Sequence, residues 1–179
     1  MWWTLPLERT ENRIMMLLGG ILLALACLVV VYYAIAVPVE NSFGERYVTS
    51  EVPLIFPFYP IATFKPITVI TYFVFAGVVL LLEGGRDWLV RLELRGARLV
   101  LVFVAFGSGY ELIWNFFAWF SSWQRTGGVL DLVSNGTHEH IFLPANFNFA
   151  TKIIFLVFAL SLYGSLFLQN LEQKRFVNR

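Results

Sequence analysis

Charged residues are scarce in this chain of 179 residues, at 14%, whereas a soluble domain typically carries about 25%. Hydrophobic residues make up 58% of the chain, and the mean hydropathy is +0.70. A small core cannot bury this much apolar surface, so we expect most of it to face lipid. The net charge is only +1 and no block of Lys or Arg occurs, which argues against nucleic acid as a partner.

Cysteine and histidine are almost absent. The single Cys27 cannot form an internal disulfide, a thiolate metal cluster or a CxxC redox pair. Both histidines, His138 and His140, lie outside the long apolar runs, which excludes a bis-His haem or a di-iron carboxylate centre inside the membrane. The sequence contains no glycine-rich phosphate loop, nucleophile elbow or HExxH motif. We therefore predict no cofactor within the spans and regard an enzymatic role as the less favoured one.

Long hydrophobic runs are the main feature that is present. Crossing about 30 Å of hydrocarbon takes roughly 20 apolar residues in a helix. Four stretches qualify: 14–37, 67–82, 99–123 and 153–168. The second and the fourth are short, and flanking polar side chains at the interfaces can complete them. The sequence thus predicts an all-α integral membrane protein, with four transmembrane helices in one bundle forming a single domain over 1–179.

The distribution of Lys and Arg predicts the orientation. Nine of the 13 lie in the N-terminal tail, the 83–98 connection and the C-terminal tail. Positively charged loops stay cytoplasmic, so we expect a cell-membrane protein with both termini inside. A cleaved signal peptide is the competing interpretation of the first run, because 34–36 reads Ala-Ile-Ala. A cleavable apolar region is shorter than this one, however.

The cytoplasmic connection 84–98 has two interpretations. On a continuous helix, Arg91, Arg95 and Arg98 would share one face and Leu89 and Leu92 another. Such an amphipathic helix would lie in the headgroup layer with its arginines on anionic lipid. The alternative is an ordinary positively charged loop.

The outer loop 38–65 is rich in proline and aromatic residues. Pro53, Pro57, Pro60 and Pro66 break any regular helix there. Its aromatic residues make it too apolar to lie free in water. We expect it either to contact a partner or to fold back on its own helices as a lid.

One ionisable side chain, Glu111, lies near the middle of the third run. A charge at that depth costs several kcal/mol. It belongs to a seam of polar or small residues at 3-4-3-4 spacing: Ser108, Glu111, Asn115, Ala118 and Ser122. Such a seam is expected to face protein or a cavity, and Asn115 can hydrogen-bond the carboxyl. The seam is either a polar clamp between helices or subunits, or part of a proton or ion path or of a quinone or lipid pocket lined by Trp114 and Trp119.

The outer loop 127–144 predicts a small β-hairpin. Asn135-Gly136 is a strong two-residue turn signal. In that register Asp131, His138 and His140 project from one face, a set that could hold Zn²⁺, Cu²⁺ or Fe²⁺. The alternative is a pair of solvated histidines. Asn135 also begins an Asn-Gly-Thr glycosylation sequon.

Three functions remain open from the sequence. The leading one is a non-catalytic subunit or assembly partner of a larger membrane complex, in contact with lipid and with other membrane subunits. The second is a small transporter or ion-conducting subunit that works through Glu111. The third is a metal-dependent membrane enzyme with its site in the outer hairpin.

Overall fold

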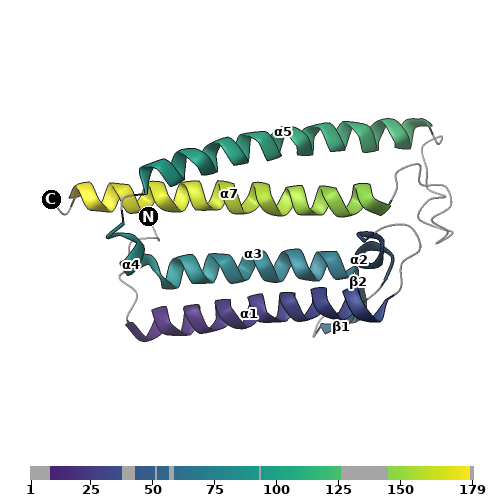
Figure 1. Ribbon diagram of the computed structural model, residues 1–179, viewed down its shortest axis with the longest axis horizontal. Coiled ribbons are helices and arrows are strands. Elements are labelled where there is room, and N and C mark those ends of the chain that lie inside the picture. The colour runs from purple at the N-terminus through teal and green to yellow at the C-terminus, as the bar shows by residue number, and fades with distance from the viewer. Residues whose placement is uncertain are drawn as a thin grey trace.

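Four long helices dominate the fold (Figure 1). The computed structural model describes residues 9–37, 43–50, 52–56, 59–92, 94–125 and 145–177, with side chains for 10–37, 43–50, 64–92, 94–121 and 147–174. The helices are α1 (Arg9–Ala36), α3 (Pro66–Gly84), α5 (Arg95–Arg125) and α7 (Ala145–Val177). All four are long and apolar enough to cross a membrane, and among the described residues their number equals the number of predicted spans.

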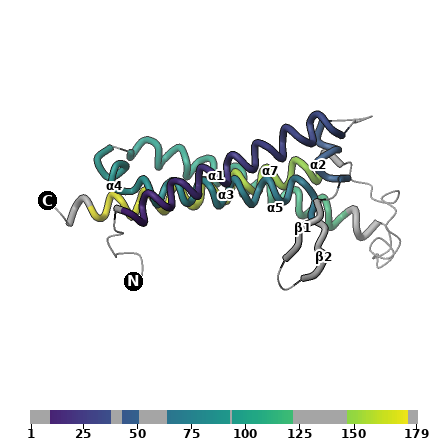
Figure 2. Tube along the Cα trace, turned by 90° about the horizontal axis from the view of Figure 1, so that it is seen from below, coloured from purple at the N-terminus to yellow at the C-terminus, as the bar shows by residue number. Residues whose placement is uncertain are grey.

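The four helices form an open row in the order α1, α3, α7, α5. Contacts are extensive within the pairs α1/α3 and α5/α7 and sparser between α3 and α7. Figure 2 looks along this row, and the helices overlap in that view. The predicted bundle is therefore a layer with two edge helices, α1 and α5, rather than four helices around one core. The helices run side by side, so the layer has two sides at which the helices end. Helix α1 begins and α7 ends on one of them, which we call the termini side. The opposite one is the loop side.

Glycines allow close packing within both pairs. A Cβ on Gly77 would lie 3.0 Å from the Gly19 carbonyl oxygen of α1, and one on Gly84 would lie 2.7 Å from that of Asn12. In the other pair, a Cβ on Gly109 of α5 would lie 3.0 Å from a ring carbon of Phe158 on α7. Small residues at these points bring the backbones together, which is the main source of packing energy between helices in lipid.

Buried side chains gather near both ends of the helices, on the loop side and on the termini side. On the loop side, Tyr47 from the short helix α2 (Glu45–Thr49) is 2% exposed and packs with Tyr33 and Ile67. Its hydroxyl donates to the Val30 carbonyl oxygen over 2.9 Å. This part of the 38–65 segment therefore folds back onto the helices. On the termini side, Phe167, Leu168 and Leu171 of α7 form a second cluster.

A strand pair follows α2, where the sequence predicts only an irregular loop. Strand β1 (Val52–Phe56) pairs antiparallel with β2 (Tyr59–Phe64), with Val52 opposite Phe64 and an irregularity between Leu54 and Phe56. Prolines are tolerated here because both strands of a two-stranded sheet are edge strands. The side chains of 52–63 and the predicted hairpin of 127–144 lie outside the described residues.

The connection 84–98 is not one continuous helix in the described residues, which favours the loop interpretation over a single amphipathic helix. Helix α4 (Arg86–Leu89) ends after one turn, and α5 begins only at Arg95. Leu89 and Leu94 pack against the apolar cluster of α7, which pulls the chain out of a single helical path. Arg91 and Arg95 are exposed, and their contact with lipid headgroups stays a prediction.

Candidate functional site

Polar side chains that join different helices gather in two layers, one toward the termini side and one toward the loop side. The termini-side layer contains Glu83, Arg86, Arg98, Tyr163 and Glu172. The loop-side layer contains Thr68, Asn115, Thr151 and Lys152. On α5, positions 98 and 115 are about 26 Å apart at 1.5 Å per residue. This spacing is close to the hydrocarbon thickness of a bilayer, about 30 Å.

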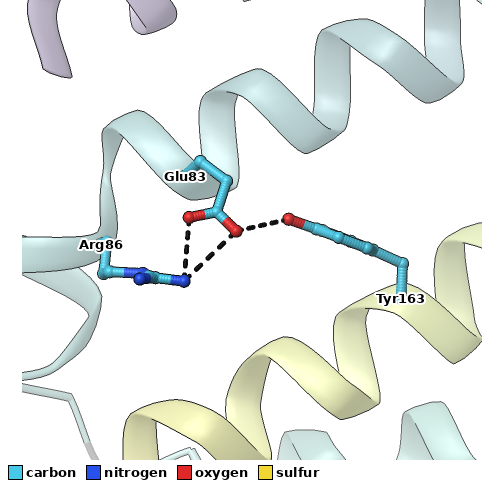
Figure 3. Close-up of polar contacts among 3 residues, drawn as sticks. All are labelled: Glu83, Arg86 and Tyr163. Carbon is cyan, nitrogen blue, oxygen red and sulfur yellow. Dashed lines mark hydrogen bonds and ion pairs between the residues drawn. The ribbon is translucent and has the colours of Figure 1, made fainter. Parts of the chain in front are cut away.

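Glu83 is the centre of the termini-side layer (Figure 3). The Tyr163 hydroxyl of α7 donates to Glu83 Oε1 over 2.7 Å. Arg86 Nη2 approaches the two carboxylate oxygens at 3.2 Å and 2.9 Å. The side chains of Glu83 and Arg86 are only 18% and 14% exposed, and the Arg86 guanidinium also lies 5.3 Å from the centre of the Phe167 ring. The acid at the end of α3 is therefore held by groups from two helical segments.

Arg98 was expected at a lipid surface, but it pairs within the chain. Its guanidinium lies 2.8 Å from Glu172 Oε2 of α7. Near the same end, the Asn12 amide of α1 donates to Asp87 Oδ2 of α4 over 3.0 Å. These contacts fix α5 against α7 and α1 against the α4 turn.

The loop-side layer joins α3, α5 and α7. Lys152 Nζ donates to Thr68 Oγ1 of α3 over 2.6 Å. Asn115 Nδ2 of α5 donates to Thr151 Oγ1 over 3.2 Å, and that hydroxyl donates in turn to the Phe147 carbonyl oxygen. The Asn115 amide thus contacts the neighbouring helix, rather than Glu111 as the sequence suggested.

The predicted polar seam of α5 is divided by the fold. Ser108 and Asn115 are partly buried toward α7, and the Ser108 hydroxyl donates to the Val104 carbonyl oxygen over 2.6 Å. Glu111 lies beside the line of contact and is exposed. Within the described residues it has no hydrogen bond or ion pair. The side chain of Ser122 lies outside the described residues.

The direction of the Glu111 side chain keeps it inside the apolar band between the two layers. Position 111 lies about 6 Å from Asn115, one turn of α5 toward the termini side. Helical Cα–Cβ bonds point toward the N-terminus of their helix, and α5 begins on the termini side. The carboxyl is therefore directed away from the nearer polar layer, the loop-side one. Along α5, position 111 is about 20 Å from position 98 of the termini-side layer.

A groove of about 530 Å³ lies beside the loop-side layer, between α3, α5 and α7. Tyr72, Phe75, Leu112, Phe155, Leu156 and Ala159 supply its apolar walls. Thr68, Thr71, Thr151 and Lys152 line it as well. In the sequence, Lys152 is one of the polar residues that flank the fourth apolar run, 153–168, and spacing alone does not show which helix its side chain meets.

Other predicted site residues are not brought together by the described structure. Asp131, Asn135, His138 and His140 lie outside the described residues, so the metal and glycosylation sites stay predictions. Elsewhere in the described chain, no group of three His, Cys, Asp or Glu side chains is placed to hold a metal ion. Trp114 and Trp119 are 63% and 48% exposed on α5, and neither lines the groove.

Comparison with known proteins adds no assignment: no family model, curated protein or solved structure matches this chain.

Proposed function

We propose that this chain is a non-catalytic integral membrane subunit that stabilises or assembles a larger membrane complex through α5. The observation that supports this most strongly is the exposed Glu111 within the apolar band. A carboxyl group in hydrocarbon costs several kcal/mol when ionised and prefers to be protonated or paired. Since its own chain supplies no partner among the described residues, a second polypeptide is the natural source of one.

The surface around Glu111 is suited to another helix. Gly107 lies one turn away on the same side, and a Cβ there would meet nothing within 4 Å. A glycine on an open face lets a second backbone approach closely at the depth of the acid. The expected partner is a transmembrane helix that presents a hydrogen-bond donor or a cation, such as an amide, hydroxyl, Lys or Arg side chain, to the carboxyl.

The proposal is tested by purification from native membranes in mild detergent. The wild-type protein should bring down a partner in constant ratio, and Glu111→Gln should retain it because the amide still forms hydrogen bonds. With Glu111→Leu, the amount of co-purified partner should fall at least about tenfold, since the helix then offers no polar contact at that depth.

Phe106→Leu is the matched control. Phe106 is 79% exposed and lies about 140° around α5 from Glu111, at 100° per residue. Its substitution should leave the partner bound. A wild-type protein that purifies alone and monodisperse, or a Glu111→Leu variant that keeps its partner, would overturn the proposal.

The proposed location is the cell membrane, with both termini on the cytoplasmic side. The support is the charge asymmetry of the sequence, with nine of the 13 Lys and Arg residues in the two tails and the 83–98 connection. In a Cys27→Ser background, a cysteine introduced at Asn178 should react with an impermeant maleimide only after the cells are opened. Labelling of intact cells would show the opposite orientation.

A further inference from the structure

Lys152 is a cation whose surroundings differ from those of Arg86 and Arg98. It lies two turns into α7 and is partly buried. Among the described residues it forms no ion pair, and its one hydrogen bond is to the neutral Thr68 hydroxyl. Arg86 and Arg98, by contrast, both meet carboxylates. An ammonium group has three donors, so Lys152 retains donors for an anion from outside the chain.

The Lys152 side chain is directed toward the loop-side surface of the membrane. Helix α7 begins at Ala145 on the loop side, and helical side chains lean toward the N-terminus of their helix. Its Nζ meets Thr68, which lies in the first turn of α3, next to Lys65. The ammonium therefore lies near the boundary between hydrocarbon and headgroups, where lipid phosphates are found.

The groove extends from this ammonium into the apolar band. Its volume of about 530 Å³ is in the range of small-ligand sites. Below Thr68 and Thr151, the walls are Phe75, Leu156 and Ala159. Tyr72 and Phe155, 73% and 58% exposed, stand at its lipid-facing surface. The site thus combines one cationic end with an apolar body, which complements an amphiphile that has an anionic head and an aliphatic tail.

We propose that this groove binds one anionic phospholipid, with its phosphate on Lys152 and an acyl chain between α3 and α7. Charge complementarity identifies the headgroup, because the site offers an ammonium and hydroxyls and no carboxylate among its lining residues. The bound lipid fills the sparsely packed junction between the two helix pairs and stabilises one pair against the other. The site is separate from Glu111, so it stands or fails independently of the proposed subunit role.

The test uses the full-length protein in detergent, with defined lipids added. Retained lipid is measured by native mass spectrometry after addition of equal amounts of phosphatidylglycerol and phosphatidylcholine. The wild-type protein should retain one phosphatidylglycerol in preference to phosphatidylcholine. Lys152→Met keeps the length of the side chain without its charge and should weaken that preference about fivefold, the contribution of one cation at a lipid surface. Lys152→Arg should restore it.

Two further variants separate the groove from general surface charge. Lys174→Met removes a partly buried cation from the other end of the same helix and should leave the preference unchanged. Ala159→Phe fills the groove and should reduce retention of the lipid even though Lys152 is intact. Equal retention of both lipids by the wild-type protein, or an equal loss in Lys152→Met and Lys174→Met, would refute the site. The wild-type comparison decides this even if a variant fails to fold.

Discussion

Glu83 and Glu111 are the same residue type on two helices of one row, and their surroundings differ completely. Glu83 lies at the end of α3, where Tyr163 and Arg86 both bind its carboxylate. Glu111 lies inside α5 with an exposed side chain and no such partner among the described residues. The difference shows that an acid in a membrane helix is not always a clamp within its own chain. Glu83 is paired within the fold, whereas Glu111 is not paired among the described residues, and the proposed function assigns its partner to a second polypeptide.

The same contrast holds for the helix surfaces around the two acids. Helix α3 is covered on both sides, by α1 and α7, whereas α5 is an edge helix that, within the described residues, packs mainly against α7. Gly77 of α3 has backbone and side-chain atoms close to its missing Cβ, and Gly107 of α5 has none. The same substitution at Glu83 and Glu111, or at Gly77 and Gly107, therefore tests by its effect on stability whether the surface of α3 is packed and that of α5 is open.

Glu83→Ala should have the largest effect on the stability of the isolated protein. It leaves the mostly buried Arg86 charge without its carboxylate and the Tyr163 hydroxyl without its acceptor. Breaking such a pair costs about 3 kcal/mol. Unfolding in detergent should show this loss, while Glu111→Ala, the same change on the open face, should lower the unfolding free energy by less than about 0.5 kcal/mol. Equal losses would remove the distinction between the two acids.

Gly77→Ala should destabilise the protein by about 1–3 kcal/mol, the usual cost of overpacking. Its Cβ would lie 2.9 Å from Leu23 Cγ and 3.0 Å from the Gly19 carbonyl oxygen, so α1 and α3 must separate slightly. The measurement is the same unfolding transition in detergent. An unchanged transition would mean that α1 and α3 are less closely packed than described.

Tyr163→Phe should cost about 1 kcal/mol, the net value of one hydrogen bond. The ring still packs against Phe167, with ring centres 6.1 Å apart, so only the contact with Glu83 is lost. In a double-mutant cycle with Glu83→Ala, the two losses should not add, because both remove the same hydrogen bond. Additive losses would show that the hydroxyl does not bind this carboxylate.

Gly107→Ala should have a small effect of opposite sign on the isolated chain, a gain in unfolding free energy of about 0.5–1 kcal/mol from the higher helix propensity of Ala. Nothing lies within 4 Å of the new methyl group. In native membranes the same variant should weaken partner retention, because the proposed neighbour approaches there. A stability loss in the purified protein would indicate that this face is already covered.

The number of membrane helices could be predicted from the sequence, because apolar runs must match the thickness of the bilayer. Their order in the row could not, since it depends on which glycines meet across helices, such as Gly19 and Gly77. Glu111 was recognised as the unusual acid, but not as the exposed one. Its 3-4 spacing groups Glu111 with Ser108 and Asn115. The part of α5 that contacts α7, however, runs through Ala105 and Gly109. The pairing of Arg98 with Glu172 joins residues far apart in sequence, so local patterning could not reveal it.

The most direct test keeps Glu111 in place and puts a photoreactive amino acid at Val104, which is exposed two turns away on the same side of α5. If this side faces another subunit, irradiation of intact membranes should crosslink the chain to one distinct polypeptide, and the same probe at position 106 should give no such product. Crosslinks from position 104 to lipid alone would contradict the account.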